Sequence, residues 1–150
     1  MSPPTPQTHQ GRRDRSDPAS STPAMDVSRI RFGKPLNPEL FNGIAKDAAR
    51  QVAEERSSNK PTQLRRFYDE LMLWESRVAH QPEKFPDYLP FIRMVNAKAA
   101  YAKGRKLVDD RFVGLMQHTL KEVTDAESLS ICKLFWEAFM GFYKEQRPND

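Results

Sequence analysis

The chain has 150 residues, of which 38% are hydrophobic and 29% charged, and its net charge is +4. This length is typical of one domain, and this composition is typical of a soluble protein and excludes a membrane-spanning or fibrous one. The single cysteine, Cys132, excludes an internal disulfide and a cysteine metal cluster, and no apolar run resembles a signal-peptide core or a membrane span. We therefore expect a cytoplasmic protein without a membrane partner.

Residues 1–28 form a segment rich in Pro, Ser and Thr, with almost no large apolar side chain. Such a segment buries too little apolar surface to offset the entropy cost of ordering, so we predict a disordered N-terminal tail. Residues 29–150 are predicted to form one helical bundle domain.

The first two predicted helices follow from capping residues and apolar spacing. Asn37 as an N-cap, followed by Pro38, predicts a helix that runs to about Arg56. A second helix is predicted to begin near Thr62, and its apolar stripe contains Leu64, Phe67, Leu71, Trp74 and Val78. The prolines of the next segment, HQPEKFPDYLP, predict that this helix ends in a loop.

Three more helices complete the predicted bundle, at about residues 91–108, 110–123 and from 124 onward. Asp109 and Asp110 stand where the fourth helix begins, which favours a capping role over a metal-binding pair. Thr124 and Glu127 have the spacing of a capping box for the fifth helix. Its apolar residues cover nearly half of its circumference: Leu129, Cys132, Phe135, Trp136, Phe139, Phe142 and Tyr143. The sequence therefore predicts an all-α fold, a compact bundle of about five helices.

The third predicted helix carries most of the positive charge, because residues 93–106 contain five basic residues and no acidic one. Wound at about 100° per residue, it has three faces. The face directed to the core contains Phe91, Ile92, Val95 and Ala99. A face of small residues, which favours close approach of another backbone, contains Ala97, Ala100 and Gly104. The third face suits a phosphate backbone, because its cations flank an aromatic ring: Met94, Lys98, Tyr101 and Arg105.

The alternative to phosphate binding is that this basic face is only solvated, since most Lys and Arg side chains on helices are exposed to water and bind nothing. Two arginines of the second helix have acidic residues in i,i+4 spacing and can pair with them: Arg65 with Asp69, and Arg66 with Glu70. Lys98 has no acidic residue three or four positions away, so its charge is predicted to be free. Tyr101 is compatible both with a binding role and with a half-buried packing role.

The sequence contains none of the motifs that usually mark a catalytic site. His9, His80 and His118 are far apart along the chain, and there is no HExxH motif, no Cys/His metal spacing and no glycine-rich phosphate loop. Cys132 falls on the broad apolar face of the fifth helix, where nothing would activate a thiolate. We therefore predict that the protein is not an enzyme and uses no metal ion and no cofactor. A small nuclease is a weaker third interpretation.

Three short motifs occur in a specific order: QLRRFYDE at 63–70, KAAYAKGR at 98–105 and FWEAFMGFYK at 135–144. In order and spacing they resemble the small subunit of the type III-A CRISPR effector, the Csm complex, over about residues 60–146. The resemblance implies a non-catalytic helical bundle of a prokaryotic antiviral complex. In that family several copies stack as a filament along guide RNA that is paired with target RNA.

The resemblance also implies partners and site residues. The backbone subunit cleaves the target, and the large subunit cleaves DNA and makes cyclic oligoadenylate, so both are expected partners of this chain. The family's basic positions fall here on Arg65, Arg66, Lys98, Arg105 and Lys144. The predicted RNA-binding set is completed by Lys60, Tyr101 and Lys103. The third motif departs from the family pattern, because Tyr143 stands where histidine is common and Gly141 where alanine is common.

The predicted function is therefore binding of guide and target RNA through the backbone, without a base-specific pocket, because base pairing reads the sequence in an RNA-guided complex. The alternative is a helical adaptor whose partners are proteins only and whose basic face is solvated.

Overall fold

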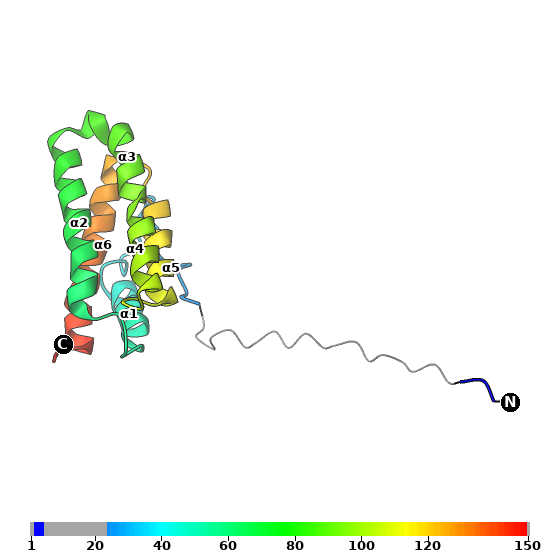
Figure 1. The fold of residues 1–150 in the computed structure, drawn as a ribbon. Coiled ribbons are helices and arrows are strands. Elements are labelled where there is room, and N and C mark those ends of the chain that lie inside the picture. Colours follow the sequence, from blue (N-terminus) through cyan, green and yellow to red (C-terminus); the bar gives the residue numbers. More distant parts are fainter. Residues whose placement is uncertain (1, 5–23, 150) are drawn as a thin grey trace.

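Helix α6 (Ala126–Gln146) is the central helix in the computed structural model, which describes residues 2–4 and 24–149 (Figure 1). It packs against α1 (Gly43–Ala53) and α2 (Pro61–His80). The other elements of the described chain are η1 (Pro82–Lys84), α3 (Phe85–Arg93), α4 (Val95–Gly104) and α5 (Asp110–Lys121). The described residues contain no strand, so the predicted all-α bundle is confirmed.

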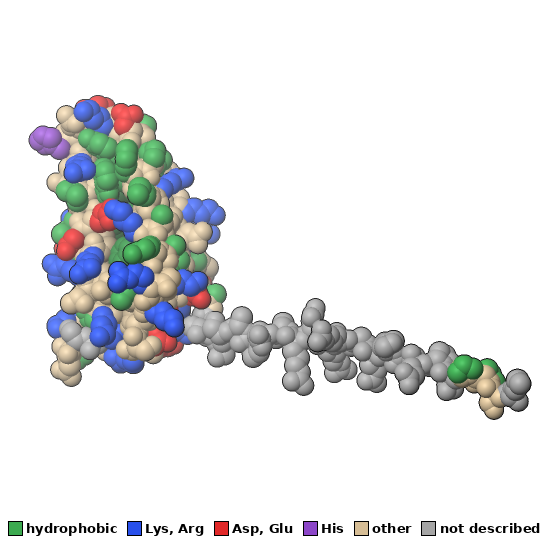
Figure 2. Space-filling view, viewed as in Figure 1, with side chains coloured by type: hydrophobic (Ala, Val, Ile, Leu, Met, Phe, Trp, Pro, Cys, Tyr) green, Lys and Arg blue, Asp and Glu red, His purple; other side chains and the backbone are tan. Residues whose placement is uncertain are grey.

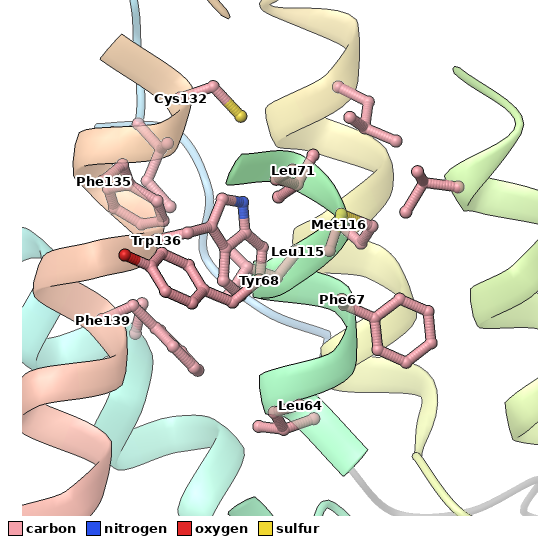
Figure 3. Close-up of a cluster of buried hydrophobic side chains, with 14 of the residues drawn as sticks. Leu64, Phe67, Tyr68, Leu71, Leu115, Met116, Cys132, Phe135, Trp136 and Phe139 are labelled. Carbon is pink, nitrogen blue, oxygen red and sulfur yellow. The ribbon is translucent and has the colours of Figure 1, made fainter. Parts of the chain in front are cut away.

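Aromatic side chains fill the space between α2, α5 and α6 (Figure 3). Trp136 is 1% exposed and contacts the rings of Phe112, Phe135 and Phe139 at centroid distances of 5.8, 5.9 and 4.9 Å. Its indole Nε1 donates a hydrogen bond to Thr119 Oγ1 at 3.1 Å, so this buried polar atom is satisfied. Because burial of one such side chain contributes about 1.5 to 3 kcal/mol, this cluster is a main source of stability.

Cys132 has the core position that the sequence predicts. Its side chain is 0% exposed on the inner face of α6. Burial raises the pKa of the Cys132 thiol to about 12, because the low-polarity surroundings disfavour the thiolate.

The segment before α1 also contributes to the core. Ile30 and Phe32 are 1% and 2% exposed. His118 Nε2 of α5 lies 2.6 Å from the Ile30 carbonyl oxygen, and the Phe32 N–H donates to Glu122 Oε1 at 3.2 Å. The predicted disordered tail, residues 1–28, lies mostly outside the described residues, so the domain division at residue 28 stays a prediction.

The predicted third helix, residues 91–108, is divided in two, so the expectation of one continuous helix is wrong. Met94 separates α3 from α4, and its carbonyl accepts a hydrogen bond from the Ala97 N–H at 2.9 Å in a tight turn. At the other end α4 stops at Gly104, because Lys106 adopts a left-handed φ of 62° that cannot continue a helix. The two pieces follow one another along the same side of the bundle (Figure 1).

The proline-rich segment after α2 is not the loop that its prolines predict, because η1 and α3 fill it. Pro82 and Pro86 stand in the first turns of these two elements, where a missing N–H leaves no hydrogen bond unmade. Pro90 lies inside α3, where Phe85 and Ile92 are buried and their packing offsets its cost.

The first helix begins later than its sequence pattern predicts. Asn37 Oδ1 accepts a hydrogen bond from the Glu39 N–H at 2.9 Å, but the chain continues in turns until α1 starts at Gly43. The Glu39 carboxylate accepts from the Gly43 N–H at 3.1 Å. The side chain that accepts a hydrogen bond from the first N–H of α1 is therefore that of Glu39 and not that of Asn37.

The capping box of α6 uses Asp125 and Ser128, not Thr124 and Glu127 as the sequence predicts. The Ser128 N–H donates to the Asp125 carboxylate at 2.7 Å, and the Asp125 N–H donates to Ser128 Oγ at 2.9 Å. The hydrogen bonds from Ser128 lower the pKa of the Asp125 carboxyl below its ordinary 3.8. Ser128 Oγ also accepts a hydrogen bond from the Thr124 N–H at 2.8 Å, the donor that Glu127 is predicted to cap.

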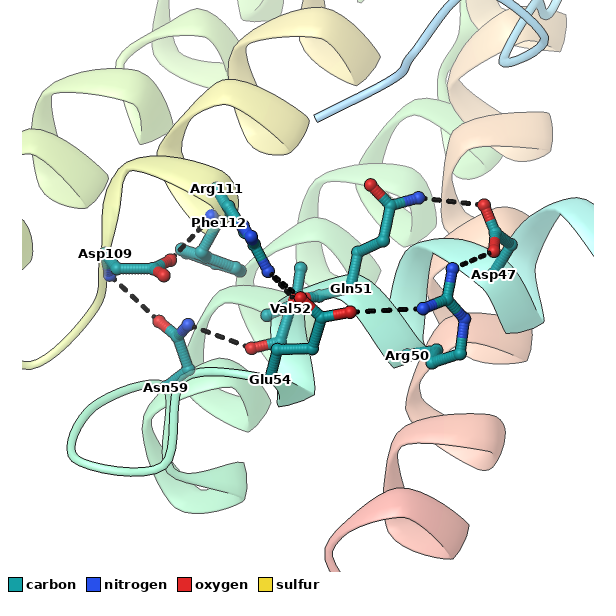
Figure 4. Close-up of polar contacts among 9 residues, drawn as sticks. All are labelled: Asp47, Arg50, Gln51, Val52, Glu54, Asn59, Asp109, Arg111 and Phe112. Carbon is teal, nitrogen blue, oxygen red and sulfur yellow. Dashed lines mark hydrogen bonds and ion pairs between the residues drawn. The ribbon is translucent and has the colours of Figure 1, made fainter. Parts of the chain in front are cut away.

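A buried asparagine joins α1, the loop after it and α5 (Figure 4). Asn59 is 0% exposed and has a left-handed φ of 57°. Its Nδ2 donates to the Val52 carbonyl at 3.2 Å, and its Oδ1 accepts from the Asp109 N–H at 2.9 Å. Asp109 accepts from the Phe112 N–H at 3.1 Å, which confirms the predicted cap of α5. Asn59 thus fixes the start of α5 against the end of α1.

Two further buried side chains are arginines with structural roles. Arg147 is 2% exposed and donates to the Asn59 carbonyl at 2.9 Å. Arg111 donates to the Gln51 carbonyl at 2.8 Å and pairs with Glu54 at 2.5 Å, and this hydrogen bond lowers the pKa of the Glu54 carboxyl (Figure 4). Both arginines act within the bundle, so neither belongs to its outer basic surface.

Candidate nucleic-acid interface

The outer side of α4 carries residues that the sequence assigns to phosphate binding. The buried side of this helix is made by Val95, Ala99 and Ala102. Lys98, Tyr101 and Arg105 are exposed to solvent. Tyr101 is 67% exposed, which excludes a half-buried packing role. The Arg105 guanidinium carbon lies 5.8 Å from the centre of the Tyr101 ring, within the range of a cation–π contact.

Lys98 does not carry the free charge that its sequence neighbours predict. Its Nζ forms an ion pair with the carboxylate of Glu70, which lies 28 positions away in the sequence on α2. The i,i+4 spacing predicts ion pairs only between residues of the same helix, so it could not predict this contact between two helices. The Lys98 and Glu70 side chains are 49% and 22% exposed, so the ion pair lies at the surface and bridges α2 and α4.

The first turns of α2 present two arginines with different surroundings. Arg65 forms the predicted i,i+4 ion pair with Asp69 at 3.2 Å. Arg66 is exposed and, among the described residues, forms no ion pair, and the carboxylate one turn after it, Glu70, is paired with Lys98. Since Arg66 and Glu70 are one turn apart on α2, Arg66 lies on the same side of this helix as the ion pair.

Arg65 and Lys144 meet where the start of α2 passes the end of α6. They line a surface hollow of about 530 Å³ whose other walls are Pro61, Thr62, Met140 and Tyr143. Lys144 Nζ donates to the Pro148 carbonyl at 3.1 Å. Lys60 precedes α2 and is exposed, and in the described part of the chain it forms no ion pair.

Lys103 lies apart from the other predicted residues. It follows Tyr101 by two positions, on the side of α4 near α5, and pairs with Asp110 at 2.5 Å. It lines a different hollow, of about 550 Å³, whose other charged residues are Lys106 and three acids, Glu55, Asp109 and Asp110. The acidic residues of that hollow disfavour a phosphate backbone there.

Figure 2 shows Lys and Arg side chains spread over the face shared by α2 and α4, with hydrophobic side chains among them. Trp74 of α2 stacks on Phe91 at a centroid distance of 5.9 Å. Phe91 is 55% exposed, Met94 54% and Leu73 49%. The prediction that Phe91 belongs to the core is therefore wrong, because its neighbour Ile92 occupies the inward position on α3.

The small residues of α4 are also exposed. Ala97, Ala100 and Gly104 all face solvent. Apart from its own helix and chain neighbours, Gly104 has no atom within 4 Å of the position that a Cβ would take. The predicted close approach of another backbone is therefore not made within the described part of the chain.

The described residues contain no group of three or more His, Cys, Asp or Glu side chains that could hold a metal ion. His80 ends α2 and is exposed, His118 contacts the Ile30 carbonyl, and His9 lies outside the described residues. In residues 2–4 and 24–149, every helix is too short or too polar to cross a membrane.

Comparison with known protein families assigns this helical bundle to one family. A family model described as Csm2 Type III-A matches residues 36–149, a range that includes α1 to α6. The chain belongs to the Csm2 type III-A family. It is therefore a small subunit of the type III-A CRISPR Csm complex, and its family is one of structural subunits that assemble with other subunits. None of the curated proteins and none of the solved structures gives a significant match.

Proposed function

We propose that this small subunit binds guide RNA paired with target RNA through the phosphate backbone, without reading base sequence and without catalysing a reaction. The observation that carries the proposal is the outer side of α4, where Lys98, Tyr101 and Arg105 are exposed beside the basic start of α2. Cations neutralise phosphates, and a tyrosine contacts sugar, phosphate or an unstacked base. Such contacts position RNA but do not read its sequence.

The eight predicted residues are not equivalent in this proposal. Arg66 and Arg105 form no ion pair in the described chain, so their charge is available to a phosphate. Lys98 and Lys103 are each paired with a carboxylate. Three cations extend the surface toward the end of α6: Lys60, Arg65 and Lys144.

We further propose that several copies stack as a filament along the RNA, beside the backbone and large subunits. Large apolar side chains exposed on α2, on α3 and at the junction of α3 with α4 support protein contacts: Leu73, Phe91 and Met94. Neighbouring apolar groups of this size at a surface are typical of interaction sites.

A helical adaptor that contacts proteins only is the second candidate. The ion pairs of Lys98 and Lys103 favour it, because a cation that is already paired has less charge for a ligand. In that case the basic face is solvated, as most surface cations are.

Binding of labelled RNA at several salt concentrations separates the two candidates. Each phosphate contact contributes about 0.7 to 0.9 to the slope of log affinity against log salt. Replacing Arg66 and Arg105 by alanine should therefore flatten that slope by about 1.4 to 1.8, equally for unrelated sequences.

A matched control removes the same charge elsewhere. Lys46 of α1 and Lys121 of α5 are exposed, so the Lys46→Ala, Lys121→Ala variant has the same net charge as the arginine variant. The control should keep the wild-type slope. Equal slopes for the wild type and both variants would contradict RNA binding by these arginines and would favour the helical adaptor.

A further inference from the structure

Glu70 places a carboxylate on the basic surface between α2 and α4, and it has no part in the proposed RNA contacts. The carboxylate is 22% exposed and paired with Lys98 Nζ. Arg66, one turn before Glu70 on the same helix, forms no ion pair in the described chain. Glu70 thus engages the cation of the neighbouring helix and leaves the arginine of its own helix available.

We propose that Glu70 is an intramolecular substitute for an RNA phosphate, which holds Lys98 and thereby limits the affinity of each copy for RNA. The inference rests on the proposed function, because it requires this surface to bind RNA. Carboxylate and phosphate oxygens accept the same charge-assisted hydrogen bonds from an ammonium group. A phosphate that approaches Lys98 therefore competes with Glu70 for the same protons.

Exposure distinguishes this ion pair from the one between Arg65 and Asp69. Those two side chains are 63% and 54% exposed and lie one turn apart on α2, where such a pair is worth a few tenths of a kcal/mol. The Lys98–Glu70 pair joins two helices, and its carboxylate is less exposed, so water and salt screen it less. Lys98 is thus the cation of this surface whose charge is most strongly offset.

Limited affinity of a single copy suits the array proposed above. Copies linked along one RNA gain affinity together, so each contact can be weak while the assembly binds tightly. A weak single contact also reduces capture of one copy by unrelated RNA, since backbone binding does not depend on sequence.

Replacing Glu70 by glutamine tests the inference in the full chain, because the side chain keeps its size and loses its charge. We expect Glu70→Gln to bind an RNA duplex about twofold to fivefold more tightly at low salt. The slope of log affinity against log salt should steepen by about 0.7 to 0.9, as for one added phosphate contact. The matched control is Glu75→Gln, on the same helix, whose carboxylate has no ion pair in the described chain. It should leave the slope unchanged.

The Lys98→Ala background shows whether Glu70 acts through Lys98. Arg66→Ala is added to that background, because Glu70 without Lys98 can pair with Arg66 one turn away. There, Glu70→Gln should no longer steepen the slope. A gain that persists there would mean direct repulsion of RNA by Glu70 and would overturn the inference. The inference is also overturned if the wild type binds RNA and the Glu70→Gln variant binds it no more tightly. The thermal melt of the variant must show that it is folded. Absence of RNA binding in the wild type and every variant would instead contradict the proposed function, and the inference with it.

Discussion

Replacement of Asn59 by alanine should destabilise the bundle more than any surface substitution, because this one side chain connects three parts of the chain. Asn59 is fully buried, donates to the Val52 carbonyl at 3.2 Å and accepts from the Asp109 N–H at 2.9 Å (Figure 4). Alanine makes neither hydrogen bond. It also has to adopt the left-handed φ of 57°, which asparagine tolerates better than most residues.

The expected loss follows from these contributions. Two hydrogen bonds are worth about 1 kcal/mol each, and the partners left unpaired in the interior add a desolvation cost of about 1 kcal/mol or more. The left-handed conformation costs alanine about 1 kcal/mol. Asn59→Ala should therefore lower the free energy of unfolding by about 3 to 5 kcal/mol, a large part of the total for a domain of this size.

Urea unfolding followed by circular dichroism measures this loss, and Asn59→Gly is the matched variant. Glycine loses the same two hydrogen bonds but adopts a positive φ without strain, so Asn59→Gly should be more stable than Asn59→Ala by about 1 kcal/mol. In a helix interior the order is the reverse. A loss below about 1 kcal/mol for alanine, or a glycine variant less stable than the alanine variant, would refute this reasoning.

Two further substitutions test local features of the fold. Lys106→Gly should raise the free energy of unfolding by about 0.5 to 1 kcal/mol in the same urea assay, because Lys106 has a left-handed φ of 62° just after α4. Asp125→Ala should lower it by about 1 kcal/mol at neutral pH. Because the folded state lowers the pKa of Asp125, this contribution is fully present above pH 3.8 and is lost as the pH falls through the lowered folded-state pKa, where the two urea midpoints should converge.

The fold could be predicted from the sequence wherever one helix face decides it. The apolar stripe of α2 and the broad apolar face of α6 are local patterns, and both are buried as expected except at Trp74 and Phe142, which are half-buried. The break at Met94 and the helical course of the proline-rich segment could not be predicted in the same way. They depend on hydrogen bonds within single turns and on packing that offsets the cost of Pro90.

The exposed residues of the candidate site could be predicted from the sequence, but their contact partners on other helices could not. The exposed positions of Tyr101 and Arg105 follow from helical periodicity. The partner of Lys98 comes from α2, and the partner of Phe91 is Trp74, also on α2. Neither contact has a counterpart in local spacing, because both require α2 to lie beside the α3–α4 segment.

Photocrosslinking in the assembled complex tests the central claim, that RNA lies along the face shared by α2 and α4. RNA carrying 4-thiouridine at successive positions is irradiated in the complex, and the crosslinked peptides of this subunit are identified by mass spectrometry. We predict crosslinks within residues 98–105, at the end of α4 and just after it, where Tyr101 is 67% exposed, and within residues 60–66, around the start of α2, for every sequence of the RNA. Crosslinks confined to α1 or α5, or none to this subunit while the other subunits crosslink, would contradict it.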